Sequence, residues 1–518
     1  MSVSSLQHPP GARLVASRRA ALPRPPTVHR TVGPFHRAAL HRVKLALVYT
    51  PYGAVRNEPG IKVVKENYGV FPSLSLLYVA GVAEAAGCEV LLLDAHAEGL
   101  TLEQAIARLR TFQPDFIGYT VTTYLFFQNL EWIRAIKQAI PVPVIVGGVH
   151  LSIYPRETLL QPAIDYAVTG EAEGSLPDLL EALVLGRDLA EVRGIAYKPG
   201  GEAGPEGALV QVTPPAEEVP VDLAPFPSRH LIRNELYYSF ISQYRNFTPL
   251  MTSRGCPFGC IFCEQGAKRF RPRSPKNVAD ELEQCAKEHG VRELDFFDSS
   301  FTIQKDRVLA ICDEIARRRL DLVWAMRSRV DRVDRELLRA LRRAGCQRVY
   351  YGIESGNAEV LRVLRKATDL DQIRRVLRET REEGLHTFGY FMVGSPGETE
   401  ETVRQTLRFA LQLDLDYAQF SKVTPMPATE LYRMLQEETG RDWWREFMLT
   451  GREVALPRPG CGLSEDEIER WIRRAYLRFY YRPRYVARAL RRLRSREEFV
   501  RSARTALQML LVRPGGGG

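Results

Sequence analysis

Three of the eight cysteines lie close together, as Cys256, Cys260 and Cys263, in the spacing C-x3-C-x2-C. Three thiolates at this spacing can ligate three irons of a cubane iron–sulfur cluster. A closed structural zinc site would need a fourth ligand, and the residues that follow the loop offer only Cys285, in the middle of a predicted helix. The spacing therefore favours a cluster whose fourth iron stays open as a Lewis-acid position for a substrate.

The cysteine loop lies between two elements that can position it. Residues 248–253 are predicted to form a short strand before the loop, and a helical pattern begins at Asn277 after it. The thiols then lie at the C-terminal end of a strand, where α/β folds bind their cofactors. From 246 to 453 the pattern continues as six strand–helix units and predicts a partial (βα)6 barrel, with further strands at 293–297, 322–326, 348–353, 387–393 and 417–422.

Residues 43–189 show a second alternation of strands and helices. Short apolar strands separated by helical patterns are expected at 43–49, 89–93, 116–121, 142–146 and 163–168. This alternation predicts a doubly wound parallel sheet, whose ligands bind near the C-terminal ends of the strands. One strand ends in Gly147-Gly148, where the lack of side chains permits close backbone approach to a ligand. Residues 190–245, rich in Gly, Pro and Glu, are predicted to be a linker.

Two sets of motifs resemble a known enzyme family. The C-x3-C-x2-C loop, with the aromatic Phe262 before its last cysteine, resembles the radical S-adenosylmethionine (SAM) enzymes. The upstream domain resembles the cobalamin-binding domain that precedes some radical SAM domains, through segments 72–80, 93–99, 147–150 and 170–173. The resemblance implies a [4Fe–4S] cluster on the three cysteines, SAM at the open iron, and cobalamin with its nucleotide tail against Gly147 and Gly148.

The resemblance also implies roles for polar residues at the strand ends of the predicted barrel. Asp298 and its neighbours would approach the methionine end of SAM, and Arg327 or Arg329 would pair with its carboxylate, for which a planar guanidinium is well suited. Glu354 would accept from the ribose or the amino group, and the turn that begins at Gly394 would lie against the adenine. The alternative for each charged residue is a structural salt bridge at the barrel rim.

A second cobalamin motif occurs in an unexpected place. Residues 94–99 match D-x-H-x-x-G, which in methionine-synthase-like domains supplies the histidine that ligates cobalt from below. In those domains the motif follows the first strand, whereas His96 follows the second, which is an edge strand in a sheet of order 2-1-3-4-5. We therefore expect His96 to be a polar loop residue, and cobalamin to bind without a protein imidazole on its cobalt.

The positive charge of the chain is concentrated near its ends. The net charge is +10, but residues 1–42 contain seven Arg and no acid, and residues 470–496 contain eleven Arg and no acid. Removing these eighteen charges leaves −8 for the remainder, which argues against a nucleic-acid-binding body. Residues 1–42 lack periodicity and are predicted to be a disordered basic extension, with a transit peptide as the alternative.

Cysteine usage and hydropathy bear on the compartment. Eight cysteines, three of them clustered, suit a reducing compartment better than a disulfide scaffold, and no apolar run reaches the roughly 18 residues that span a bilayer. We therefore expect a cytoplasmic protein.

In the helical region 454–518, Trp471, Phe479 and Tyr480 share one face and arginines the other. This pattern suggests peripheral contact with an anionic membrane, at its inner face, and a lipid-like or hydrophobic substrate; the alternative is a helix packed on the barrel.

The resemblance implies an enzyme that cleaves SAM reductively at a [4Fe–4S] cluster to a 5′-deoxyadenosyl radical, with an electron from a donor such as flavodoxin or ferredoxin. The commonest use of the cobalamin and radical SAM pairing is methylation of an unactivated carbon. One alternative is a cyclase or oxidase resembling the anaerobic magnesium-protoporphyrin ester cyclase, with no methyl delivered. An alternative of another class is a non-catalytic cobalamin or redox sensor, against which the intact C-x3-C-x2-C loop argues.

Overall fold

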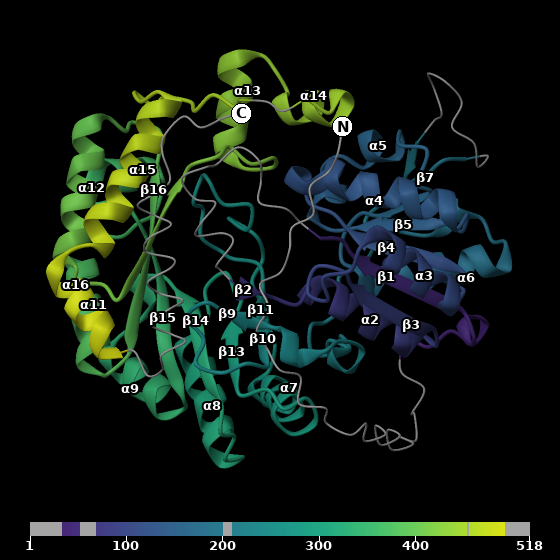
Figure 1. Ribbon diagram of the computed structural model, residues 1–518, viewed down its shortest axis with the longest axis horizontal. Coiled ribbons are helices and arrows are strands. Elements are labelled where there is room, and N and C mark those ends of the chain that lie inside the picture. The colour runs from purple at the N-terminus through teal and green to yellow at the C-terminus, as the bar shows by residue number, and fades with distance from the viewer. Residues whose placement is uncertain (1–33, 52–68, 200–209, 453–454, 493–518) are drawn as a thin grey trace, which may run out of the picture. The chain divides into compact units, whose positions relative to one another are not determined.

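The computed structural model describes residues 34–51, 69–199, 210–452 and 455–492. From Phe35 onwards these residues belong to one compact unit, which contains two large sheets (Figure 1). Predictions for residues 1–33, and for the part of the basic tail beyond 492, lie outside the described residues. Residues 1–42 are predicted to be disordered, but Phe35 and Leu40 are buried, so the folded domain begins several residues earlier than residue 43.

The first sheet has the predicted doubly wound order. Five parallel strands run in the order β3-β1-β4-β5-β6. Strand β3, which is the second of these five along the chain and precedes His96, therefore lies at the edge, as predicted. Two antiparallel strands, β7 and β8, extend the sheet from the region predicted to be a linker. The strands are β1 (Lys44–Tyr49), β3 (Glu89–Asp94), β4 (Phe116–Thr120), β5 (Val144–Gly147), β6 (Tyr166–Val168), β7 (Ile195–Tyr197) and β8 (Gln211–Val212).

Helices cover both faces of this sheet, because its strands are apolar on both sides. One apolar cluster joins α2 and α6 to Leu45 and Leu47 of β1, and another joins α3, α4 and α5 to Ala46 and Val48 of the same strand. Alternate residues of β1 therefore face opposite helical layers. The helices are α2 (Leu74–Ala86), α3 (Leu102–Phe112), α4 (Phe126–Ala139), α5 (Pro155–Leu159) and α6 (Leu176–Leu185).

The second sheet consists of six parallel strands in sequential order, β10-β13-β14-β15-β16-β17, which confirms the predicted partial barrel. Helices line its outer face (Figure 1). The strands are β10 (Phe247–Leu250), β13 (Glu293–Phe296), β14 (Val323–Ser328), β15 (Cys346–Glu354), β16 (His386–Val393) and β17 (Tyr417–Lys422). The intervening helices are α7 (Pro275–Glu288), α8 (Lys305–Arg317), α9 (Arg335–Arg343), α10 (Ala358–Val363), α11 (Leu370–Glu382) and α12 (Glu400–Gln412).

Two short ribbons tie distant segments together. Strand β11 (Ser253–Arg254), directly before the cysteine loop, pairs with β12 (Arg271–Pro272) directly after it. Strand β2 (Gly69–Val70) pairs with β9 (Tyr238–Ser239), which lies shortly before β10. The cysteine loop is therefore closed at its base by a ladder of backbone hydrogen bonds.

Helix α15 (Glu465–Tyr480) begins at a capping box formed by Ser464 and Glu467. Its aromatic face is buried in the barrel core, with Trp471 5% exposed and Phe479 0% exposed, and the Tyr476 hydroxyl accepts from Phe420 N. The expectation that this face meets a membrane is therefore wrong, because β17 and its neighbours already cover it. Helix α16 (Pro483–Arg492) follows. Within the described residues, no helix combines the length and apolar character needed to cross a membrane.

Helices α13 (Glu430–Thr439) and α14 (Trp443–Thr450) join the two halves of the unit. Trp444 and Met448 of α14 are buried in the same apolar cluster as α3 and α4 of the first sheet. Asp442, at the start of α14, accepts from the Tyr154 hydroxyl at 3.1 Å, and Arg445 pairs with Glu157 of α5 at 2.8 Å. A segment that follows the last barrel strand therefore packs against the first domain.

Candidate active site

The three cysteines lie on a compact loop whose shape is set by its own backbone. Cys263 N donates to Cys260 O at 3.2 Å, and Lys268 N donates to Cys256 O at 2.9 Å. Gly255 has a φ of 79°, and a Cβ there would lie 2.0 Å from Arg269 O, so no side chain fits. The loop between β11 and β12 thus presents its thiols in one fixed turn.

Cations lie close to the thiols. Burial raises the pKa of Cys256, while Arg329 and Lys366 nearby act to lower it. Burial also raises the pKa of Cys263, and the neighbouring Cys260 and Cys256 raise it further. Both other thiols act on the pKa of Cys263, so the three lie near one another, and Arg329 and Lys366 supply positive charge beside them.

Arg329 contacts the cysteine loop itself. Its Nη1 lies 3.7 Å from Cys260 Sγ, and its guanidinium lies over the Phe258 ring at 4.1 Å. The other donors bond Asp331 and the Lys366 carbonyl. Arg329 was one of two candidates for pairing with a carboxylate of SAM, but here it binds the thiol loop and its own neighbours.

Arg327, the other candidate, lies on the inner face of the barrel. Its Nη1 donates to Asp295 Oδ1 at 2.9 Å, and its guanidinium lies over the rings of Phe297 and Tyr350, at 4.1 and 5.1 Å from their centroids. Arg327 thus combines a salt bridge with two aromatic contacts. Its predicted role as partner of a carboxylate stays a prediction.

Asp298 holds the backbone that leads into the cysteine loop. It is 1% exposed, and its carboxylate accepts from Thr252 N at 2.6 Å, from Ser253 N at 3.2 Å, and from the Thr252 hydroxyl. Burial raises the pKa of Asp298 against these hydrogen bonds, which lower it. Asp298 thus positions the segment that enters the loop, and its predicted approach to the methionine end of SAM stays a prediction.

Glu354 ends β15 in a buried ion pair. Its Oε1 lies 2.8 Å from Lys366 Nζ, and both side chains are almost fully buried. Glu354 has a φ of 67°, which is uncommon for a residue with a side chain. The pair places Lys366 beside the cysteine loop, so Glu354 acts on the thiols through Lys366 in addition to its predicted role toward the ribose or amino group.

Phe262 and the turn after β16 are the remaining residues of the barrel for which the sequence predicts a role at the site. The Phe262 ring packs against an apolar cluster that includes Ile261 and Leu364, so it anchors the loop. Gly394 has a φ of 96°, and Gly394 N and Ser395 N donate to Glu398 Oε2 at 2.6 and 2.8 Å. Burial raises the pKa of Glu398 to about 7.

At the C-terminal end of β5 in the first sheet lie two glycines, Gly147 and Gly148, in place of charged side chains. Gly148 has a φ of 114°, and a Cβ there would lie 2.6 Å from Val121 O, so the turn after β5 packs tightly on the turn after β4. Among the residues that the structure describes, no atom lies within 4 Å of a Cβ placed on Gly147. Gly147 therefore faces open space at the edge where a doubly wound sheet binds its ligand.

Two histidines in this domain have unlike surroundings. His150, which sequence reasoning left without a role, is fully buried: its Nδ1 lies 3.0 Å from Thr123 Oγ1 and its Nε2 lies 3.0 Å from Thr158 Oγ1. The Thr158 hydroxyl donates to Tyr154 O, so it accepts from His150 Nε2–H, and burial lowers the pKa of His150 to about 4. His150 is thus a neutral residue that braces the turn after β5. His96 follows edge strand β3, and burial lowers its pKa.

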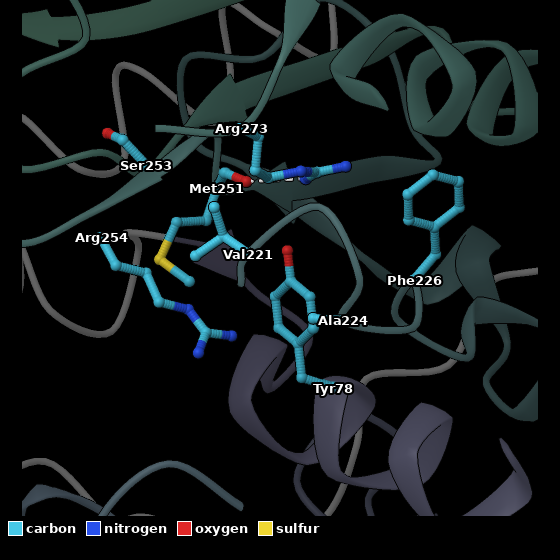
Figure 2. A pocket seen from close by; sticks show the side chains of 8 residues that line it. All are labelled: Tyr78, Val221, Ala224, Phe226, Met251, Ser253, Arg254 and Arg273. Atoms are coloured by element: carbon cyan, nitrogen blue, oxygen red, sulfur yellow. Dashed lines mark hydrogen bonds between the residues drawn. The ribbon is translucent and has the colours of Figure 1, made fainter. Parts of the chain in front are cut away.

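A small cavity lies between helix α2 and the segment that enters the cysteine loop (Figure 2). Tyr78 of α2 points into it, Met251 and Arg254 border it from the barrel side, and Phe226 closes one end. Arg273 donates to Met251 O at 2.8 Å and pairs with Glu281 of α7 at 2.5 Å. The cavity is therefore walled by residues of α2, of the connecting segment and of the cysteine loop's base.

The sequence matches two family models: the B12 binding domain over residues 60–180 and the Radical SAM superfamily over residues 250–410. It is 33% identical to an uncharacterized methyltransferase of Pyrococcus horikoshii over 452 residues, which cover 86% of this chain and 94% of that protein. The chain belongs to the cobalamin-binding radical SAM enzymes.

Two further proteins are similar to this radical SAM enzyme. The anaerobic magnesium-protoporphyrin IX monomethyl ester cyclase of Rubrivivax gelatinosus is 30% identical over 380 residues, 71% of this chain and 67% of that protein. The structure of the cobalamin-dependent SAM radical enzyme OxsB, with aqua-cobalamin and SAM bound, superposes with a TM-score of 0.67 at 19% identity, and covers 91% of this chain and 72% of that one. The second likeness confirms the fold.

The residues of this enzyme fit the family's cofactors, which are a [4Fe–4S] cluster, SAM and cobalamin. Cys256, Cys260 and Cys263 are free thiols on one turn, and their C-x3-C-x2-C spacing suits a multi-iron cluster. The open space at Gly147 suits a cofactor tail. When bound, the cofactors supply electron transfer and methyl-carrying chemistry, while the protein orients them and excludes water.

Sequence reasoning missed residues whose importance depends on distant partners. Lys366 lies 12 residues after Glu354, the end of β15, yet its pair with Glu354 brings it beside the thiols. Glu171 and Glu173 were noted as part of a motif without a role, yet both bind Arg254. The only signal available was their place at the C-terminal end of a strand.

Proposed function

We infer that this enzyme methylates an unactivated carbon of a small molecule. The observation that best supports this proposal is the direct ionic contact between the strand-end loop of the cobalamin-binding domain and the base of the cysteine loop, through Arg254, Glu171 and Glu173. A methyl group passed by way of cobalamin must reach a substrate radical formed in the barrel, so the two sites must be held together. The 33% identity to a methyltransferase over nearly its whole length adds support.

The proposed reaction consumes two molecules of SAM for each methyl group delivered. One gives its methyl group to the substrate by way of cobalamin and leaves as S-adenosylhomocysteine. The other is cleaved with one electron to methionine and a 5′-deoxyadenosyl radical, which removes a hydrogen atom from the substrate carbon and leaves as 5′-deoxyadenosine. A second electron would return the cobalamin, once its methyl group has been delivered, to the state that accepts the next one. Both electrons would come from a donor such as flavodoxin or ferredoxin.

The test is an assay of the reconstituted enzyme with SAM, cobalamin and a chemical reductant. We expect both S-adenosylhomocysteine and 5′-deoxyadenosine, and transfer of label from methyl-labelled SAM to a product when extracts of the source cells are added. The Cys263→Ala variant is the control, since it should form no 5′-deoxyadenosine. Failure of the wild-type enzyme to form S-adenosylhomocysteine would contradict the proposal.

A cyclase or oxidase function is the second candidate, favoured by the 30% identity to the Rubrivivax gelatinosus cyclase. It predicts 5′-deoxyadenosine without transfer of labelled methyl to any product. Formation of neither nucleoside, with both cofactors bound, would instead indicate a cobalamin or redox sensor.

A hydrophobic substrate remains our proposal for the barrel. On its inner face, the partly exposed rings of Tyr390 and Tyr417 pack against the buried Tyr350 and Phe388. Such a wall can bind a planar or aliphatic substrate by burial of apolar area. Substrates of this kind should compete with binding of a hydrophobic fluorophore to the enzyme, whereas sugars should not.

A peripheral contact with an anionic membrane also remains a proposal, now assigned to arginines alone. Arg470, Arg474 and Arg478 are exposed on α15, opposite the face that packs on the barrel. Each basic residue near such a surface contributes about 1 kcal/mol of attraction, and salt screens it. Sedimentation with anionic vesicles should exceed that with neutral vesicles at low salt only; equal binding to both would contradict the contact.

A further inference from the structure

Four charged side chains connect the cobalamin-binding domain to the base of the cysteine loop. Arg254 Nη1 lies 2.7 Å from Glu171 Oε2, and Arg254 Nη2 lies 2.5 Å from Glu173 Oε1. Arg271, which faces Arg254 across the β11–β12 ladder, also binds Glu171. We call Glu171, Glu173, Arg254 and Arg271 the interdomain bridge.

Three of the four side chains of the bridge are largely shielded from water, whereas that of Glu171 is 35% exposed. The side chain of Glu173 is 4% exposed, and those of Arg254 and Arg271 are 16% and 14% exposed. A third carboxylate, Glu218, lies outside the bridge at 3.4 Å from Arg271 Nε. Arg254 also lies over the ring of Tyr78 on α2, 5.7 Å from the centroid, at the border of the cavity in Figure 2. Removing one partner from a buried pair leaves an uncompensated charge, which is strongly unfavourable.

Each half of the bridge lies next to one cofactor site. Arg254 is two residues before Cys256, with only Gly255 between them. Glu171 and Glu173 follow β6, which pairs with β5, the strand that ends in Gly147. A shift of the bridge would therefore move the cysteine loop relative to the strand ends of the cobalamin-binding domain.

We propose that the interdomain bridge sets the separation between the cluster and the cobalamin, and that its four members are positioning residues for transfer of the methyl group of SAM to cobalamin. The inference rests on the proposed function. Reductive cleavage of SAM needs only the barrel, whereas methyl donation needs SAM and cobalamin held at a fixed distance. Loss of the bridge should therefore weaken methyl donation and leave cleavage in place.

The main variant is Glu171→Gln with Glu173→Gln, which keeps the shape of both side chains and removes their charge. The matched control is Glu157→Gln, which removes the ion pair with Arg445, a second contact between the two halves of the unit that involves neither cofactor edge. Arg271→Lys is a milder variant, which keeps the charge and loses the planar fork. It keeps the test decisive if the double variant does not fold.

Two measurements do not depend on turnover. In the cofactor-free protein, hydrogen exchange should rise at residues 169–175 and 254–271 together in the bridge variants, and stay as in the wild type at both segments in Glu157→Gln. In protein loaded with the reduced cluster and Co(II) cobalamin, pulsed electron paramagnetic resonance should give one narrow distance between the two spins for the wild type and a broadened distribution for the bridge variants.

The activity readout is the ratio of S-adenosylhomocysteine to 5′-deoxyadenosine. We expect this ratio to fall about tenfold or more in the bridge variants, since truncating one partner of a buried charge pair has effects of this size, and to stay unchanged in Glu157→Gln. Distance distribution and exchange equal to those of the control would overturn the proposal. If the wild type forms no S-adenosylhomocysteine, the proposed function fails, while the spin distance and the exchange pattern still decide the role of the bridge.

Discussion

The two sheets present different chemistry at the C-terminal ends of their strands. In the first sheet, β5 ends in Gly147 and Gly148, where backbone packs on backbone and Gly147 faces open space. In the barrel, β14 ends in Arg327 and Ser328, followed by Arg329, and β15 ends in Glu354, all within networks of charge and hydrogen bonds. One edge is shaped by the absence of side chains, the other by their charge.

This difference follows from what each edge must hold. A bulky cofactor that contacts backbone needs room, so small residues serve it and substitutions there act sterically. A cluster on three thiolates and a zwitterionic substrate need compensating charge, so Arg and Lys lie nearby and substitutions there act electrostatically. The four predictions below test this contrast.

The largest effect is expected at the thiols. Cys256→Ala, Cys260→Ala or Cys263→Ala should each abolish the visible absorbance of the cluster and all 5′-deoxyadenosine formation, because each removes a ligand for which the loop has no substitute. The control is Cys312→Ala, a core thiol on α8, which should retain both. A triple variant that still binds a redox-active cluster would show that the loop is not the site.

The next effect concerns charge in the turn after β16. Burial raises the pKa of Glu398 from 4.5 to about 7, so its contribution to the free energy of unfolding is greatest below pH 4.5 and is lost as pH rises through 7. Glu398→Gln removes this dependence. Relative to wild type, the variant should gain about 3 kcal/mol in free energy of unfolding between those two pH values. Urea titrations at several pH values would measure it, and a constant difference would contradict it.

A smaller effect is expected from shape at the cobalamin edge. Gly147→Ala adds a methyl group where no atom of the described part of the chain lies within 4 Å, so the melting temperature should not change. The methyl group would obstruct close approach of a cofactor tail, and cobalamin should bind about tenfold more weakly, or about 1.4 kcal/mol. Equilibrium titration measures the affinity. Gly186→Ala lies at the far end of α6, where the described residues also leave room but φ is 64°; it should lower the melting temperature and leave affinity intact.

The smallest effect is expected at His96. His96→Ala should leave cobalamin affinity and its absorption spectrum unchanged, because the residue follows edge strand β3, away from the β4–β5 turns. Loss of a histidine-ligated form from the spectrum, or a collapse of affinity, would show that His96 binds the cobalt. The contrast between the two sheets would then fail, because a side chain would be essential at the cobalamin edge.

Local patterns in the sequence were sufficient for the architecture. Alternation of apolar strands and helices predicted both parallel sheets, and the predicted strand order of the first sheet, in which His96 follows an edge strand, is the observed one. The cysteine spacing located the thiol loop, since the ligands of such a site lie within a few residues of one another. Contiguous signals of this kind can be read without knowing what lies across the fold.

Side-chain partners from distant segments were decided only by the tertiary structure. Asp298 bonds to Thr252, and Arg329 reaches both Cys260 and the carbonyl of Lys366, so their partners could not be known from strand-end position alone.

The helical tail shows the same limit. An amphipathic pattern states that one face of α15 is buried but not what buries it, and the barrel core buries it here. Periodicity and motif spacing are properties of adjacent residues, and the sequence by itself determined what they encode: two parallel sheets, a thiol loop and the family. Burial, ion pairing and pKa depend on atoms brought together by folding, so the partners of Arg254, Glu354 and Trp471 were decided only when the chain was folded.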